Sequence, residues 1–171
     1  MPRWPSGSRP PGTSDLSAVD RFQAALRARG VEVAARVLPD SARTAPEAAA
    51  AVGVEVGAIV KSLVFRCGDE AVLALVSGGN RADEARLEAE FGAPVSRADA
   101  DLVRAATGFS IGGVPPLGHP EPLRTLVDED LLGHEVVWAA AGTPHAVFPI
   151  EPAELARLAG GRVVRLAAPA R

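Results

Sequence analysis

The alternation of hydrophobic and polar residues predicts a chain of short helices and strands. Hydrophobic residues at helical spacing between capping residues and glycines indicate helices, while β-branched runs and alternating positions indicate strands. The predicted helices span residues 14–30, 44–53, 83–91, 97–106 and 152–158. The predicted strands span residues 31–38, 58–66, 70–76, 107–111, 123–127, 135–141, 146–150 and 162–166.

The order of these elements favours an α+β fold. Strands follow one another as hairpins instead of alternating regularly with helices, which argues against a doubly wound sheet. The chain has 171 residues, enough for one domain with a full core. We expect a single domain over 14–168 with a curled, mixed, mostly antiparallel sheet, barrel-like and flanked by helices. Residues 1–13, rich in Pro, Gly, Ser and Arg, are expected to form a disordered tail.

One lysine lies in the middle of the predicted strand at 58–66. Lys61 is the only lysine of the chain, which otherwise uses 17 arginines as its basic residues. A lysine kept inside an apolar, β-branched run indicates a site that needs a compact point charge instead of a planar guanidinium. The alternative is a strand lysine whose stem packs on apolar surface while its head reaches water. The pattern alone leaves both interpretations open.

A loop rich in glycine and proline at 112–120 is the second unusual stretch. Prolines fix φ and remove N–H donors, while glycines allow positive φ and close backbone approach. The remaining amides of such a rigid wall can bind a ligand carbonyl or oxyanion. The alternative is a tight structural connection. The spacing fits neither a P-loop nor a dinucleotide-binding GxGxxG motif.

Composition and charge narrow the classes of protein further. The net charge of −3 and the pI near 5.6 argue against a large nonspecific nucleic-acid surface, although a small contact with an RNA end stays open. The single Cys67 permits no internal disulfide, which fits a reducing compartment. No apolar run is long enough for a membrane span, and the first residues lack the apolar core of a secretory signal. We therefore expect a cytoplasmic protein.

Motifs for metal binding or nucleophilic catalysis are absent from the sequence. His119, His134 and His145 have neither the spacing nor the cysteine partners of a zinc site. Ser62 and Ser110 lack the G-x-S-x-G setting of a serine hydrolase. No metal is therefore expected.

Two other reactive features are interpreted as structural. Cys67 lies in a predicted turn, with no neighbouring group that would lower its pKa. The acidic run Asp128-Glu129-Asp130 at a strand end is expected to be solvated or to cap the next helix instead of binding a cation.

Three stretches together resemble the YbaK/ProX family of free-standing aminoacyl-tRNA deacylases, which is related to the editing insertion of bacterial prolyl-tRNA synthetases. They are Ile59-Val60-Lys61-Ser62-Leu63-Val64-Phe65, then Thr107-Gly108-Phe109-Ser110-Ile111-Gly112-Gly113-Val114-Pro115-Pro116-Leu117-Gly118-His119, and Gly142-Thr143-Pro144-His145 before an apolar strand. Their order and separations agree too, so the likeness covers about residues 16–166. The Gly-Gly-x-x-Pro-x-Gly element downstream of a strand lysine is its most specific part.

The resemblance implies hydrolysis of the ester between a wrong amino acid and the 3′-terminal adenosine of tRNA. By this likeness Lys61 would lie near the ester and hold phosphate or carbonyl oxygens as a point charge. The backbone around Gly112 and Gly113 would bind the aminoacyl group and stabilise charge on its carbonyl oxygen. The sequence offers no obvious general base, which fits the family's substrate-assisted mechanism, in which a ribose hydroxyl positions the water.

The same resemblance implies the remaining site residues and the partners. His145 would shape the amino-acid pocket. Further substrate-binding residues are expected at Ser62, Phe65, Ser110, Val114 and Pro115. The partner would be the acceptor end of a mischarged tRNA, with no cofactor, no membrane and no DNA. Because the net charge is acidic, we expect weak affinity for tRNA alone, or recruitment through a synthetase or an elongation factor.

Two other functions stay open at the level of sequence. The chain could be a non-catalytic module that binds an amino acid or aminoacyl-tRNA on the same fold. It could also hydrolyse another activated acyl adduct, such as an aminoacyl nucleotide. The sequence leaves open which amino acid is removed and which tRNA is read.

Overall fold

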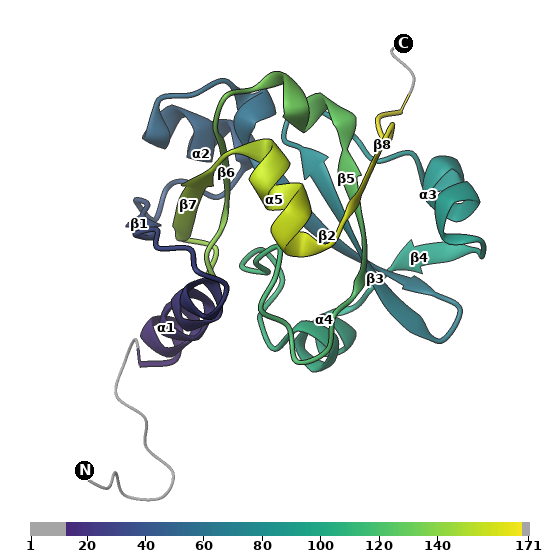
Figure 1. The fold of residues 1–171 in the computed structure, drawn as a ribbon, viewed down its shortest axis with the longest axis horizontal. Coiled ribbons are helices and arrows are strands. Elements are labelled where there is room, and N and C mark those ends of the chain that lie inside the picture. Colours follow the sequence, from purple (N-terminus) through teal and green to yellow (C-terminus); the bar gives the residue numbers. More distant parts are fainter. Residues whose placement is uncertain (1–12, 169–171) are drawn as a thin grey trace, which may run out of the picture.

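The computed structural model describes residues 13–168 and shows helices packed around two β-sheets (Figure 1). The α-helices are α1 (Thr13–Ala28), α2 (Ala45–Val52), α3 (Glu84–Phe91), α4 (Ala100–Thr107) and α5 (Pro152–Ala159). The strands are β1 (Arg36–Val37), β2 (Val60–Cys67), β3 (Glu70–Ser77), β4 (Val95–Arg97), β5 (Arg124–Asp128), β6 (Val137–Ala140), β7 (Ala146–Ile150) and β8 (Arg162–Val164). Two 3₁₀ helices, η1 (Val56–Ala58) and η2 (Glu129–Gly133), precede β2 and follow β5. The predicted tail lies outside the described residues except for Thr13, where α1 begins.

The strands form two sheets that meet at one place. The five-stranded sheet has the order β4-β2-β3-β5-β8, with antiparallel β4–β2 and β2–β3 pairs and parallel β3–β5 and β5–β8 pairs. The three-stranded antiparallel sheet has the order β1-β7-β6. An isolated bridge between Ile59 and Trp138 links them. The α+β class and the mixed sheet are thus confirmed. The barrel-like closure is not, because within residues 13–168 these two sheets are joined only at that bridge.

The capped helix and the hairpin predicted around the central strand are present. The Thr44 hydroxyl accepts from the Glu47 amide at 3.3 Å and donates to the Glu47 carboxylate at 2.8 Å, so Thr44 caps the start of α2. Strands β2 and β3 pair in register from Val60↔Ser77 to Cys67↔Glu70. Of the strand predicted at 31–38, only β1 (Arg36–Val37) is present in the structure.

The strand predicted at 107–111 is wrong. Thr107 is the last residue of α4, and Gly108 follows it in the left-handed region with a φ of 80°. The Thr107 hydroxyl accepts from the Phe109 amide at 3.1 Å, which holds a turn after the helix. The β-branched and aromatic residues favoured a strand here, but the glycine C-cap decides the local structure.

The helix predicted from residue 97 begins later, at Ala100. Its cap is Asp99, whose carboxylate accepts from the Leu102 amide at 2.8 Å. Residues 95–97 form β4, where Ser96 lies opposite Arg66 of β2. This short edge strand was not predicted, because its pairing comes from a long-range contact.

Hydrophobic cores lie on both faces of the five-stranded sheet. The larger core joins both sheets to α1, α4 and α5, and in it the rings of Phe22 and Phe148 lie 4.8 Å apart. The smaller core lies under α3 and contains Phe65 and Phe91. Strand β2 contributes to both cores, which fixes its position in the middle of the molecule.

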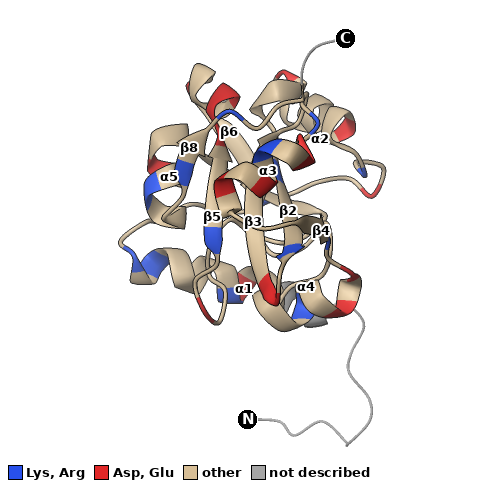
Figure 2. Ribbon diagram, turned by 90° about the vertical axis from the view of Figure 1, so that its right-hand side faces the viewer, with Lys and Arg blue, Asp and Glu red and all other residues tan. Residues whose placement is uncertain are grey.

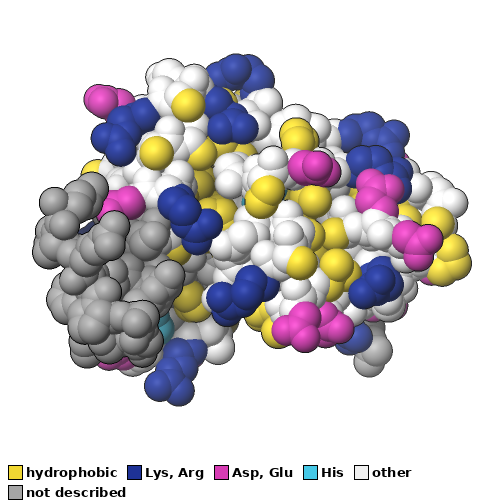
Figure 3. All heavy atoms as spheres, turned by 90° about the horizontal axis from the view of Figure 1, so that it is seen from below, with side chains coloured by type: hydrophobic (Ala, Val, Ile, Leu, Met, Phe, Trp, Pro, Cys, Tyr) yellow, Lys and Arg dark blue, Asp and Glu magenta, His cyan; other side chains and the backbone are white. Residues whose placement is uncertain are grey.

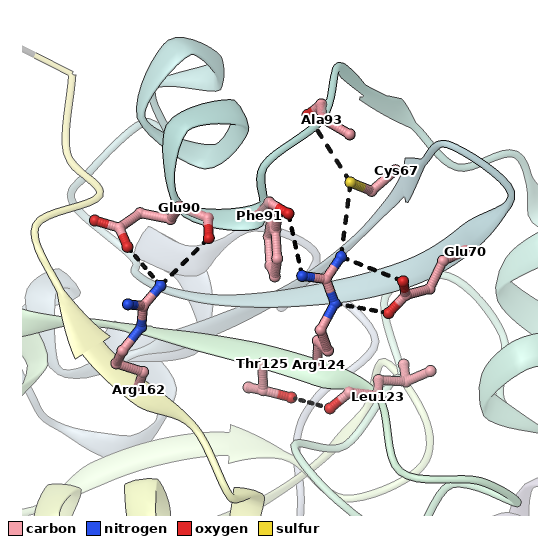
Figure 4. A network of polar contacts seen from close by, with 9 residues as sticks. All are labelled: Cys67, Glu70, Glu90, Phe91, Ala93, Leu123, Arg124, Thr125 and Arg162. Atoms are coloured by element: carbon pink, nitrogen blue, oxygen red, sulfur yellow. Dashed lines mark hydrogen bonds and ion pairs between the residues drawn. The ribbon is translucent and has the colours of Figure 1, made fainter.

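A polar network ties α3 to strands β3, β5 and β8 (Figure 4). Arg124 donates to the Glu70 carboxylate at 2.8 Å and to the Phe91 carbonyl at 3.1 Å, and its guanidinium lies 3.9 Å from the buried thiol of Cys67. Arg162 donates to the Glu90 carboxylate at 2.6 Å. Because these ion pairs are partly exposed, we expect each to contribute less than about 1 kcal/mol and mainly to orient α3.

Charged side chains of both signs are spread over the ribbon and the surface. Figure 2 shows acidic and basic residues interspersed along the elements, and Figure 3 shows hydrophobic surface between cations and anions on the lower face. None of the helices in residues 13–168 has the length and hydrophobicity needed to span a bilayer.

Candidate active site

A cavity of about 310 Å³ lies between the two sheets, along the outer edge of β2. Its walls come from residues 60–64 of β2, from the loop at 111–114, from the segment 38–48 that leads into α2, and from the β6–β7 hairpin. Ile59, which forms the bridge to Trp138, also lies in the lining, together with Trp138 itself. The cavity therefore lies beside the bridge that links the two sheets.

The edge of β2 is open because its neighbour β4 is short. β4 pairs with residues 65–67 of β2, and the last contact is the Ala98 amide donating to the Val64 carbonyl at 3.2 Å. Residues 60–63 thus face the cavity along their outer edge. Phe65 does not line it, contrary to the expectation from sequence, because it lies opposite Arg97 of β4 and packs in the core under α3.

Lys61 lies on this open edge, half-buried in the cavity lining. Its Nζ donates to the Asn80 carbonyl. Burial is the main cause that lowers the pKa of Lys61 below its ordinary value; Arg97 lowers it further, and Asp128 opposes both. The surroundings of Lys61 therefore make its ammonium easier to deprotonate than that of a lysine in water.

The glycine loop forms another wall of the cavity that Lys61 lines. Gly112 lines the cavity with a φ of 87°, and its amide donates to no backbone carbonyl within residues 13–168. That amide is free to bind a carbonyl oxygen of a ligand.

Gly113, expected in the same role, has a packing function in the structure. Its amide donates to the Ser110 carbonyl at 3.0 Å, and it is outside the cavity lining. A Cβ at this position would lie 2.6 Å from Thr143 Cα and 3.0 Å from the Gly142 carbonyl oxygen. Only glycine allows the loop to approach the 142–145 turn this closely, so Gly113 shapes the wall that Gly112 presents.

Two of the expected substrate-binding residues line the cavity. Val114 contributes to its apolar wall. Ser62 also lines it, and the Ser62 hydroxyl is buried with no hydrogen-bond partner among the described residues. An unpartnered buried hydroxyl is costly, by about 1–3 kcal/mol, and a bound polar group would satisfy it.

The other three expected residues lie behind the walls. Ser110 is exposed and its hydroxyl accepts from Arg104 at 3.0 Å, while Pro115 is buried beside the loop. His145 supports the hairpin turn through its amide, which donates to the Thr143 hydroxyl at 3.3 Å. The neighbouring Pro144 is the turn residue that reaches the cavity.

The sequence did not reveal two cations in the cavity lining. Arg43 precedes α2, and Arg97 lies on β4 with its guanidinium 5.7 Å from the centre of the Phe65 ring. With Lys61 they give three cations among the lining residues of the described chain, and none of those residues is Asp or Glu. The cavity is thus locally positive in a chain whose net charge is −3.

The acidic run behaves in part as predicted. Asp128 caps η2, since its carboxylate accepts from the Asp130 amide at 3.0 Å. It is fully buried, however, and not solvated. In the described residues no group of three or more His, Cys, Asp and Glu side chains could hold a metal ion.

Comparison with known sequences identifies relatives of this chain. The profile of the aminoacyl-tRNA editing domain matches residues 39–158. Protein YwhH of Bacillus subtilis is 30% identical over 124 residues, which cover 72% of this chain and 79% of YwhH. The proline–tRNA ligase of Streptococcus sanguinis is 30% identical over 125 residues, which cover 71% of this chain and 20% of the ligase.

Solved structures show the same fold. A candidate trans-editing enzyme for prolyl tRNA synthetase superposes with a TM-score of 0.86 at 48% identity, covering 95% of this chain and 100% of that one. The hypothetical protein APE2540 superposes with a TM-score of 0.79 at 29% identity, covering 86% and 99% of the two chains. The matched residues 39–158 include most of the fold and the cavity walls from β2 to the β6–β7 hairpin. This chain therefore belongs to the aminoacyl-tRNA editing domain family.

Proposed function

We propose that this protein is a trans-editing hydrolase that removes a mischarged amino acid from the 3′ end of tRNA. The observation that carries the proposal is one small cavity lined both by the only lysine of the chain and by Gly112, whose amide donates to no backbone carbonyl within residues 13–168. Family membership and the resemblance to part of a proline–tRNA ligase support the choice of substrate.

The cavity supplies electrostatics and shape for ester hydrolysis. The ammonium of Lys61 would hold a carbonyl or phosphate oxygen of the substrate, and the Gly112 amide would stabilise the negative charge that develops on the ester carbonyl oxygen. An aminoacyl ester is already activated, so orientation and charge stabilisation are the main requirements.

No His, Asp or Glu lies among the lining residues of the described chain. We therefore assign the positioning of water to a hydroxyl of the terminal ribose. The water oxygen attacks the carbonyl carbon, the ester C–O bond breaks, and the ribose oxygen leaves as a hydroxyl after taking up a proton. The products are the free amino acid and an uncharged tRNA.

The size of the cavity determines which substrates fit. A volume of about 310 Å³ lies at the lower end of small-molecule sites and suits a small aminoacyl group. A larger cognate amino acid would be excluded by steric clash, whereas discrimination by binding alone yields only about 1–3 kcal/mol per methylene group.

The partner would be the acceptor end of tRNA, met in the cytoplasm. Cations at the cavity would contact the terminal nucleotides, while the mixed surface charge gives little further affinity (Figure 3). We propose that a synthetase or an elongation factor brings the charged tRNA to this protein.

The test is deacylation of a panel of mischarged tRNAs by the wild type, Lys61→Ala and Arg66→Ala. Arg66 is the matched control, because it is an exposed cation on the same strand outside the cavity lining. We expect Lys61→Ala to lower kcat/KM by about 100-fold or more, as the loss of one oxyanion-stabilising group does, and Arg66→Ala to retain activity. A wild type that hydrolyses no member of the panel would contradict the proposal and favour a binding module.

A further inference from the structure

A buried carboxylate anchors the segment that holds Lys61. The Lys61 ammonium donates to the carbonyl of Asn80, in the segment that follows β3. The side-chain amide of the same Asn80 donates to Asp128 Oδ2 at 2.9 Å. Asp128 ends β5 and is fully buried, with an exposed fraction of 0%. A continuous chain of hydrogen bonds therefore runs from the cavity into the five-stranded sheet.

Asp128 makes more contacts than a helix cap requires. Besides capping η2 through Oδ1, it accepts from the Ser77 amide at 3.0 Å through Oδ2. Ser77 is the last residue of β3 and Asn80 lies three residues beyond it, so the carboxylate binds the Asn80 segment at both ends. The Gly78 amide adds a hydrogen bond of 2.7 Å to the Ile59 carbonyl. The position of the Asn80 carbonyl is thus restrained by Asp128 and by Ile59, the residue that precedes the strand of Lys61.

We propose that Asp128 is a positioning residue for Lys61, fixing the segment 77–80 so that the Asn80 carbonyl holds the ammonium in place beside the cavity. The inference rests on the proposed function only in taking Lys61 as the group that meets the ester. Asp128 itself is absent from the cavity lining, so it acts through Asn80.

The charges around Lys61 determine whether loss of Asp128 raises or lowers the pKa of the lysine. Arg97 approaches from β4 and lowers the pKa of Lys61, as does burial, while Asp128 from β5 raises it. Arg43 lines the same cavity from the segment before α2, and Asp130 of η2 accepts from the Asn80 side chain at 2.7 Å. Removal of the Asp128 charge leaves burial and Arg97 unopposed, so the pKa of Lys61 falls further.

The single lysine makes the test direct. In protein labelled with isotopic lysine, the side-chain NMR spectrum contains one signal, from Lys61, and its pH titration gives the protonation midpoint. We expect Asp128→Asn to move this midpoint to lower pH and to lower kcat/KM for mischarged tRNA by about 10- to 100-fold, the scale of a misplaced catalytic group. The alkaline limb of the pH–rate profile should move in the same direction.

Asp130→Asn is the matched control. It removes an exposed carboxylate that binds the same Asn80 amide, but it leaves the buried one in place. We expect its Lys61 midpoint and its kcat/KM to stay at the wild-type values. A midpoint that moves equally in both variants would contradict the role of Asp128.

Asn80→Ala keeps the inference testable if Asp128→Asn does not fold. This variant retains the buried carboxylate and its bond to the Ser77 amide but removes the second amide that joins it to the segment, so a smaller change in the same direction is expected for both the midpoint and kcat/KM. An unchanged midpoint in the folded variants would overturn the inference. Because the NMR titration needs no substrate, a wild type without deacylase activity would refute the proposed function and still leave the role of Asp128 measurable.

Discussion

The protonation of Lys61 is set by opposing neighbours, and this gives the site a pH dependence. Since burial and Arg97 lower the pKa of Lys61, the ammonium is present at low pH and is lost as the pH rises through that lowered value. If the charged form meets the ester, kcat/KM should fall on the alkaline side of the profile earlier than an unperturbed lysine would predict.

Arg97→Gln should shift this alkaline limb in the opposite direction to Asp128→Asn. Removing the guanidinium removes one cause that lowers the pKa of Lys61, so the midpoint should move to higher pH. The pH profile of kcat/KM and the NMR titration of the single lysine measure the same quantity independently. Arg66→Gln, a change of an exposed arginine on β2, is the control and should leave the midpoint in place. A fall of the midpoint in Arg97→Gln would contradict this account of the site.

Single residues of the site could be predicted only where an unusual residue type marks them. The lone lysine and the glycines of the 112–118 loop stand out in the sequence, and the structure places Lys61 and Gly112 around one cavity. Arg43 and Arg97 are two of many arginines, and nothing local distinguishes them. Their position in the cavity follows from chain segments that are distant in sequence, which hydrophobic periodicity does not report.

The loop that carries Gly112 depends on its contact with the β6–β7 hairpin. Gly113→Ala would place a Cβ 2.6 Å from Thr143 Cα, a backbone atom that cannot move aside. We expect a loss of about 1–3 kcal/mol in the free energy of unfolding, as for other overpacked sites, together with lower deacylase activity.

Urea unfolding and the deacylation assay measure the effect of Gly113→Ala. Gly133→Ala is the control, because a Cβ at Gly133 would meet no heavy atom within 4 Å. Equal stability of the Gly113→Ala variant and the wild type would contradict the close approach of the two loops.

At the scale of elements, local signals were sufficient for the helices and the central hairpin. The N-cap of α2 and the alternation on either side of the turn at Gly68 act over a few residues, and both elements are present as predicted. Strand β4 and the turn at 107–109 were missed, since an edge strand depends on its partner and a C-cap glycine overrides the β preference of its neighbours.

At the scale of the whole molecule, α1 is part of the core that supports the glycine- and proline-rich loop at 112–120 and the turn at 142–145. Its residue Phe22 is fully buried against Phe148 of β7, and Gly118 and Gly142 approach the same helix closely. Helix α1 lies outside the residues matched by the family profile, yet the site rests on it.

Phe22→Ala should therefore destabilise the whole fold. Truncation of a fully buried phenylalanine costs about 3–5 kcal/mol, because contacts are lost and a cavity is left behind. Thermal and urea unfolding measure this loss. Val37→Ala, at a position with 80% exposure, is the hydrophobic control and should change stability by less than about 0.5 kcal/mol. A Phe22→Ala variant as stable as the wild type would show that α1 does not belong to the core.

The walls of the cavity come from segments that are distant from one another in the sequence. The charged group is carried by β2, whereas the shape of the opposite wall depends on the 111–114 loop and the 142–145 turn. Under the proposed function, substitutions in that turn would alter the fit of the aminoacyl group while Lys61 and its supports stay in place. In evolutionary terms, new specificities would then arise by drift in one short turn, without change in the strand that carries Lys61.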